Sequence, residues 1–171
     1  MRRFIHFPWL LVLLGLPAGA ASKPVDARDM KAALIYNFAV FTSWPENGSN
    51  AFTVCAFDED QDNVNRHLLK SKNINGRQVH FTIIRHIGEL ENCQVLYLEK
   101  SKNLENKRLS ESLVDFSILS IVDVTEKPGD SGIISIRQVN SKYYFTINNE
   151  EAKRAGLMVS SKLLRLAAEV Y

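Results

Sequence analysis

The sequence lacks the short motifs that mark most enzymes and metal sites. It contains no H-E-x-x-H, no C-x-x-C, no G-x-S-x-G and no glycine-rich phosphate loop. Three histidines, His67, His80 and His86, follow residue 20, and they include no i, i+4 pair with a third ligand nearby. Because metal binding and acid–base catalysis need converging groups of this kind, the residues predict a protein without a catalytic centre, a metal site or a cofactor.

An excess of charge of one sign is also absent. The chain carries 21 Lys and Arg against 19 Asp and Glu, and two of the basic residues, Arg2 and Arg3, lie at the extreme N-terminus. Proteins that bind nucleic acid usually present a strong basic field. We therefore expect no nucleic-acid partner.

The sequence has no hydrophobic run long enough to span a bilayer. Its longest run covers about ten residues, 7–16, whereas a spanning helix needs ~20. Arg2 and Arg3 precede the run and Ala18-Gly19-Ala20 follow it, which is the layout of a signal peptide. The alternative, an uncleaved anchor, is disfavoured by the short run. We expect a signal peptide over residues 1–20, export to the periplasm, and a single domain over residues 21–171.

Cysteine is scarce, with only Cys55 and Cys93 in the chain. In an oxidising compartment such a pair is compatible with one disulfide. Two buried thiols that act as small apolar groups are the alternative. Spacing alone does not decide between them.

The first segment of the expected domain is typical of an amphipathic helix. Residues 26–41 place a stripe at helical spacing, and Asp26 is suited to cap the first turn. The residues of this stripe are expected to face the core: Met30, Ala33, Leu34, Asn37, Phe38 and Phe41.

After residue 51, β-rich and helical patterns alternate. Strands are expected within 52–57, 74–86, 93–101 and 117–124, with helices within 58–72 and 102–116 and a short helical turn or a loop at 87–93. This alternation is typical of parallel βαβ units. Two alternating runs then flank Asn140-Ser141 within residues 133–148, which predicts an antiparallel hairpin. The fold class is therefore α/β, a mixed sheet of about six strands covered by helices.

Acidic residues follow three of the expected parallel strands, at the end of the sheet where α/β proteins bind ligands. They are Asp58, Asp60, Glu99 and Asp123. A calcium loop starting at Asp58 fails, because its sixth position is Asn63 and its twelfth is Leu69. A small-molecule-binding receptor, or an accessory of a transporter or sensor kinase, is the alternative function that these acids leave open.

The C-terminal segment contains a series of capping signals. Asn148 and Glu151 form a capping box, Gly156 ends one short helix, and Ser160 is suited to cap another. The last helix is expected to continue to Val170, because its apolar face would consist of Leu163, Leu164, Leu166, Ala167 and Val170.

Four stretches, "MKAALIYNFAVFTSWPE", "FTVCAF", "CQVLYLEKS" and "YYFTINNEEAKRAGLMVSSKLLRLA", resemble the YfiR family of exported proteins of Gram-negative bacteria. The resemblance implies an α/β fold, a periplasmic homodimer and a non-enzymatic role in biofilm regulation. It implies repression of an inner-membrane diguanylate cyclase through the cyclase's periplasmic sensor domain, with lower cyclic-di-GMP as the result. An outer-membrane OmpA-like lipoprotein would sequester the repressor.

The resemblance also bears on particular residues. Family members carry cysteines at the positions of Cys55 and Cys93, which implies a disulfide between them, whereas a second family pair is missing here. No short family motif identifies the partner-binding surface. As a hypothesis, we nominate the charged residues of the C-terminal segment: Glu150, Lys153, Arg154, Lys162 and Arg165.

Overall fold

The structure is a computed structural model that describes residues 25–45, 50–99, 107–124 and 132–171. The expected signal peptide, residues 1–20, lies outside these ranges. Within them, no helix has both the length and the apolar character needed to cross a membrane.

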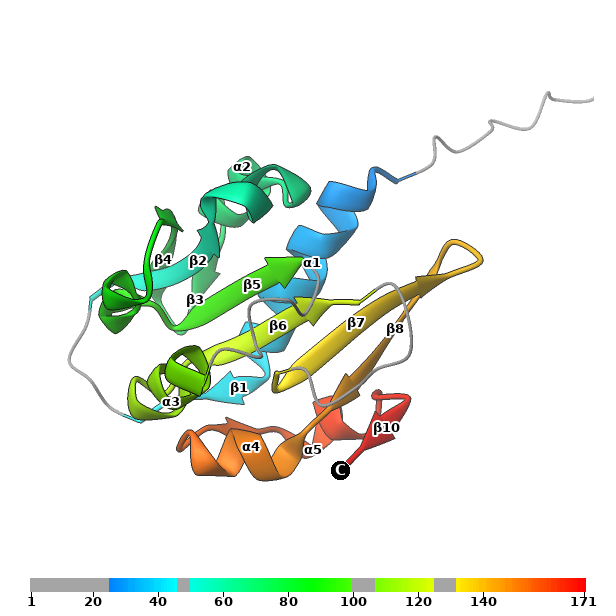
Figure 1. Ribbon diagram of the computed structural model, residues 1–171. Helices are drawn as coiled ribbons and strands as arrows, with labels where there is room; N and C mark the ends of the chain where they lie inside the picture. The colour runs from blue at the N-terminus through cyan, green and yellow to red at the C-terminus, as the bar shows by residue number, and fades with distance from the viewer. Residues whose placement is uncertain (1–24, 46–49, 100–106, 125–131) are drawn as a thin grey trace, which may run out of the picture.

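A mixed, eight-stranded sheet forms the centre of the molecule (Figure 1), in the order β10-β8-β7-β6-β5-β2-β4-β3. Its six longer strands are those that the sequence predicts: β2 (Phe52–Phe57), β4 (Arg77–Ile84), β5 (Val95–Glu99), β6 (Leu119–Asp123), β7 (Ile134–Val139) and β8 (Lys142–Ile147). The first five run parallel to one another, and β8 runs antiparallel to β7. The predicted fold class is confirmed, and two short edge strands, β3 (Asn73–Ile74) and β10 (Glu169–Val170), raise the number of strands.

The central strands are buried on both faces, as their continuous apolar runs predict. All but the last residue of β5 and of β6 is buried, and β2 has a single partly exposed position. The predicted hairpin is also confirmed. Asn140 and Ser141 both adopt positive φ, 48° and 63°, which is the backbone that a two-residue hairpin turn requires.

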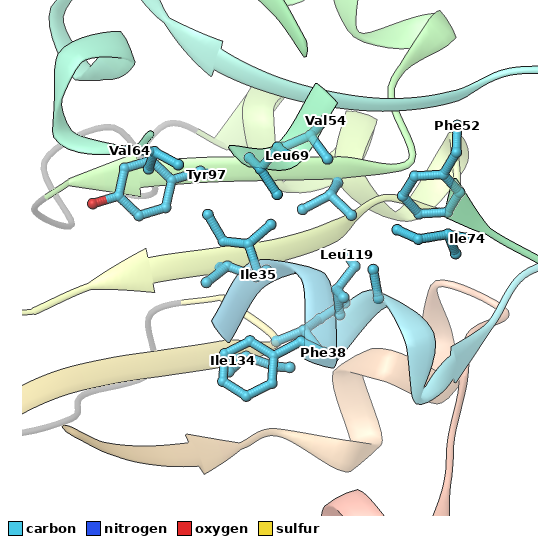
Figure 2. Packing of buried hydrophobic residues seen from close by; sticks show 14 of the residues in the cluster. Ile35, Phe38, Phe52, Val54, Val64, Leu69, Ile74, Tyr97, Leu119 and Ile134 are labelled. Carbon is cyan, nitrogen blue, oxygen red and sulfur yellow. The ribbon is translucent and has the colours of Figure 1, made fainter. Parts of the chain in front are cut away.

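One face of the sheet is covered by α1 (Ala27–Val40), which Asp26 caps as predicted. Figure 2 shows Ile35 and Phe38 of α1 directed toward Leu119 and Ile134 of the sheet.

The predicted stripe on α1 is wrong in part. The buried face consists of Ala32, Ile35, Phe38 and Ala39, whereas Asn37 is exposed and bonds back to the Ala33 carbonyl, 2.8 Å away. The remaining members of the predicted stripe, Met30, Ala33, Leu34 and Phe41, are only partly buried. The contact face thus combines two small side chains, Ala32 and Ala39, with the large Ile35 and Phe38, and it is rotated by about one position from the predicted stripe.

The opposite face carries η2 (Ile87–Asn92), the predicted helical turn, and α3 (Lys107–Asp115). Residues 102–106 of the predicted third helix lie outside the described ranges. Between β2 and β4, the single helix expected within 58–72 is instead a 3-10 helix, η1 (Asp58–Asn63), followed by α2 (Arg66–Lys70). The break occurs because Val64 is buried and the Asn65 side chain accepts bonds from the first amides of α2.

The C-terminal segment begins as predicted. Asn148 caps α4 (Asn149–Arg154), Gly156 has a φ of 71°, and Ser160 caps α5 (Ser161–Leu164). Between these helices, β9 (Met158–Val159) pairs with β1 (Thr42–Ser43) in a separate two-stranded sheet.

The prediction of a last helix reaching Val170 is wrong. The helix ends at Leu164 and the chain then forms β10 at the edge of the sheet, parallel to β8. The Ala168 amide donates to the Phe145 carbonyl at 2.8 Å, and the Tyr171 amide donates to the Ile147 carbonyl at 3.0 Å. These bonds to a sheet edge satisfy the backbone that a longer helix would have paired internally. As a result, Leu166 and Val170 are exposed, and Leu163 is the buried member of the predicted apolar face.

Candidate functional site

Three of the four acids expected at the carboxyl end of the parallel strands lie together around a lysine. The Lys31 ammonium, from α1, lies 2.7 Å from Asp123 Oδ2 and 3.6 Å from Glu99 Oε1. Asp60, in η1, is buried and accepts a bond from the Glu99 backbone amide. The fourth acid, Asp58, is exposed and accepts a bond from the Gln61 side chain instead.

Two side chains that the sequence reasoning missed complete the bonding of this cluster. The Tyr97 hydroxyl donates to Asp123 Oδ2 at 3.4 Å, and the Asn63 side chain donates to Glu99 Oε2. Lys31 was also missed, although a signal for it exists. It stands four residues before Ile35 on the buried face of α1, and a lysine on a core-facing stripe needs a carboxylate partner.

The cluster perturbs the protonation of its members. Burial raises the pKa of Asp60 to about 6, with Glu59 and Glu99 adding to the effect and the Glu99 amide and Lys31 opposing it. Burial disfavours the charged form of Lys31, but the hydrogen bond to Asp123 and the charges of Asp123 and Glu99 outweigh it, so its pKa is raised. Burial, reinforced by Asp123 and Glu99, also raises the pKa of Tyr97.

The chain's own ammonium therefore binds the carboxylates that a ligand would use at this end of the sheet. Within the described ranges, no group of three His, Cys, Asp or Glu side chains is arranged to hold a metal ion. The arrangement joins α1 to the ends of β5 and β6 by ion pairs.

A cavity of about 750 Å³ lies elsewhere, between α3 and α4. Its lining includes Leu113 and Asp115 of α3, Glu151 and Arg154 of α4, Ser120 of β6, and Ile133 directly before β7. The cavity is partly apolar and partly charged, and its size is typical of small-molecule sites. Sequence reasoning did not find it, because its walls come from segments far apart in the chain.

The five nominated residues of the C-terminal segment divide into two groups. On α4, Lys153 lies 2.7 Å from Glu150, and Arg154 lies 2.7 Å from Glu151. These pairs are local, exposed and charge-neutral together, so they present little net charge to a partner.

The two cations near α5 are different. Lys162 lies over the Phe41 ring at 5.0 Å from its centroid, and neither Lys162 nor Arg165 has a carboxylate partner in the part of the chain that the structure describes. Two of the most exposed apolar side chains, Met158 at 71% and Leu166 at 64%, stand in the same short segment. We refer to Met158, Lys162, Arg165 and Leu166 as the β9–α5 surface.

Cys55 and Cys93 form the disulfide that the family resemblance implied. Their Cα atoms lie 5.9 Å apart, and both residues are buried on the α3 side of the sheet. The bridge links β2 to the start of β5 across 38 positions of the sequence.

A search of curated proteins gives no significant match. Among solved structures, the chain is similar to an ABC domain in complex with L-Trp from Streptococcus pneumonia, at 11% identity and a TM-score of 0.49. The similarity covers 71% of this chain and 56% of that chain, so the present chain corresponds to about half of that domain's length. The family model described as YfiR/HmsC-like matches residues 28–168, which is most of the chain, and the protein belongs to that family.

Proposed function

We propose that this protein is an exported, non-enzymatic regulator that represses an inner-membrane diguanylate cyclase by binding the cyclase's periplasmic sensor domain. Repression would lower cyclic-di-GMP and thereby limit biofilm formation. The family match over residues 28–168 is the observation that carries the proposal. The disulfide supports export, because such bridges persist mainly in oxidising compartments.

Repression of this kind needs differential affinity. A binding protein shifts its partner between active and inactive states only by as much as its affinities for those states differ. We infer that the free repressor binds the inactive sensor domain more tightly, and that an OmpA-like outer-membrane lipoprotein relieves repression by sequestering it. A homodimer would present two copies of the binding surface to the cyclase.

Of the nominated residues, those of α5 are the better candidates for this surface. Lys162 and Arg165 combine positive charge with the exposed Met158 and Leu166 beside them in the chain. Apolar side chains rimmed by charge are typical of protein–protein contacts. Glu150, Lys153 and Arg154 remain in the proposal as a second group, with a smaller expected effect because their charges are paired locally.

The test compares two charge reversals. We propose that the sensor domain meets Lys162 and Arg165 with acidic side chains. The double variant Lys162→Glu, Arg165→Glu should then bind the purified sensor domain at least about tenfold more weakly, since the reversed charges would repel those side chains. The matched control, Lys153→Glu with Arg154→Glu, makes the same change of net charge on α4 and should weaken binding less. Both variants should melt close to wild type. Equal binding by the α5 variant and wild type would remove the β9–α5 surface from the proposal.

A second candidate function is favoured by the cavity between α3 and α4. Its volume of about 750 Å³ falls in the range of small-molecule sites, which favours a ligand-binding accessory of a transporter or sensor kinase. Leu113→Trp would fill the cavity. If this reading holds, a compound screen should find ligands that raise the melting temperature of wild type but not of Leu113→Trp. A screen in which every stabilising compound acts equally on both would exclude the cavity as the site.

Export itself is testable by mass spectrometry of the protein recovered from a periplasmic fraction. We expect a chain that begins at Ala21, after cleavage of residues 1–20. Recovery of a full-length chain in the membrane fraction would contradict the signal-peptide proposal.

A further inference from the structure

Asp60 is an unusual residue for a regulatory domain that has no catalytic role for it. It is only 4% exposed, and its Oδ2 atom has no hydrogen-bond partner among the described residues. The Glu99 backbone amide satisfies part of the carboxyl group. A buried carboxylate oxygen without a partner costs free energy in the ionised state, whereas a protonated carboxyl is much less penalised.

The charges that surround Asp60 do not balance. Lys31 comes from α1, Glu59 from η1 itself, Tyr97 and Glu99 from β5, and Asp123 from β6. Tyr143 of β8 interacts electrostatically with Lys31 and Asp123, and its buried hydroxyl has no partner within the described ranges.

Lys31 is the ammonium that this cluster contains, and it is already paired. Its Nζ atom lies 2.7 Å from Asp123 and 3.6 Å from Glu99, whereas no ion pair joins it to Asp60. Ionised Asp60 therefore adds a third negative charge to a site with one positive charge. Repulsion between Asp60 and Glu99 then opposes the packing of η1 against the end of β5.

We propose that Asp60 is a proton-binding switch that controls how firmly α1 and η1 pack on the carboxyl end of the sheet. When Asp60 is protonated, it no longer repels Glu99, and Lys31 stays with Asp123 and Glu99. When Asp60 is ionised, it competes for Lys31 and weakens the ion pairs that hold α1 on β5 and β6. Protonation of Asp60 therefore tightens the packing of α1 and η1 on the sheet.

The direction of the pH effect follows from burial. The pKa of Asp60 is raised from its ordinary 3.8 to about 6. The folded protein therefore binds a proton that the unfolded chain releases, and this contribution to stability is fully present below about pH 4 and is lost as pH rises through about 6.

The output of the switch is at the β9–α5 surface, and this step rests on the proposed function. The residue after α1, Phe41, accepts a bond from the Ser160 amide at 2.9 Å, and Lys162 packs over the Phe41 ring. Firmer packing of α1 therefore holds the start of α5 in place. An exported protein meets the proton concentration of the surroundings, so acidity would strengthen binding to the cyclase's sensor domain.

The switch is tested first without any partner, on the full chain that begins at Ala21. Carbon-13 NMR of the aspartate carboxyl groups should give one titration with a midpoint near pH 6, which Asp60→Asn removes. The melting temperature of wild type should be higher at pH 5 than at pH 7.5, while Asp60→Asn should lose this difference. Asp62→Asn is the matched control, because Asp62 lies on the same segment with an 85% exposed side chain, and it should keep the difference.

A wild-type carboxyl titration with every midpoint below about pH 4.5 would overturn the switch, whether or not Asp60→Asn folds. A folded Asp60→Asn variant whose melting temperature keeps the full pH dependence of wild type would also overturn the switch. Binding to the sensor domain is then compared at pH 5.5 and pH 7.5. We expect wild type to bind several-fold more tightly at pH 5.5, and Asp60→Asn to bind equally at both values. Sensor-domain binding without this pH response would remove the output of the switch but leave the proposed function standing.

Discussion

Lys31 is the side chain that neutralises the carboxyl end of the sheet. Replacing it by methionine removes the ammonium and leaves Asp123 and Glu99 without their cation, at a cost of about 2–4 kcal/mol in the free energy of unfolding. Urea titration at pH 7.5 measures this cost. Lys70→Met, on the exposed end of α2, is the control and should change stability by less than about 0.5 kcal/mol. Equal stability of the two variants would show that the Lys31 ion pairs contribute nothing.

Two glycines separate the effect of backbone conformation from that of contact. Gly76 and Gly132 have nearly the same φ, 77° and 80°, but a Cβ at Gly132 would lie 2.8 Å from Val122 Cγ2, whereas at Gly76 it would meet nothing within 4 Å. We expect Gly76→Ala to cost about 1 kcal/mol through its strained backbone, and Gly132→Ala to cost about 2–4 kcal/mol through strain and overlap together. Chemical unfolding of both variants checks this order, and a reversed order would contradict the packing around Gly132.

At the scale of elements, β10 holds the C-terminus against the sheet. Three backbone hydrogen bonds form at or beside it: the Ala168 amide donates to Phe145, the Tyr171 amide to Ile147, and the Asn149 amide to Tyr171. Removing residues 168–171 should lower the free energy of unfolding by about 1–3 kcal/mol. Hydrogen exchange should become faster at Asn149, whose amide loses its acceptor, and Glu169→Lys should leave that exchange unchanged. Wild-type stability in the truncated chain would mean that these bonds are not maintained in solution.

The disulfide is a second link between elements, since it joins β2 to the segment directly before β5. Because it closes 38 positions of chain, loss of the bridge in the double variant Cys55→Ser, Cys93→Ser should cost about 3–4 kcal/mol. Thermal unfolding of the oxidised wild type and the variant measures this difference. As a hypothesis, a reducible bridge next to the central strand would give repression a redox input; repression that persists equally in the variant would exclude that role.

Elements with local signals could be predicted from the sequence. The six longer strands have continuous or alternating apolar patterns, and the caps at Asp26, Asn148 and Ser160 depend on side chains within the same turn. The end of the chain could not be predicted in this way. Residues 165–170 carry a helical pattern, but backbone bonds to β8, distant in sequence, determine their conformation.

The same distinction applies to the candidate sites. The acids after β2, β5 and β6 were predictable, because parallel strands end at one edge of the sheet. The position of Lys31 on the core-facing side of its helix predicts a carboxylate partner, but which carboxylates it pairs with could not be predicted, since the crossing of α1 over that edge is a tertiary property. Likewise, sequence composition nominated the charges of α4 and α5 equally, and only the structure separates the paired Lys153 and Arg154 from the cations near α5.

At the scale of the whole molecule, the protein has two separate groups of charged residues, one buried and one exposed. The buried cluster around Lys31 joins α1 to the sheet by ion pairs, whereas the β9–α5 surface has cations without a carboxylate partner among the described residues and exposed apolar side chains in the same segment. A change in the buried cluster would therefore alter partner binding at the β9–α5 surface, because α1 and Phe41 connect the two regions. Salt should therefore weaken partner binding by screening Lys162 and Arg165, while it should affect the buried cluster much less.

We propose that the mature protein represses a membrane diguanylate cyclase through the cyclase's periplasmic sensor domain, on the strength of its membership of the YfiR/HmsC-like family. The most direct measurement is the rate of cyclic-di-GMP synthesis by the full-length cyclase in proteoliposomes, with the purified chain from Ala21 added on the sensor side. We expect the rate to fall with increasing protein and to recover when Lys162 and Arg165 are both replaced by glutamate. An unchanged rate at saturating concentrations of folded wild-type protein would contradict the account.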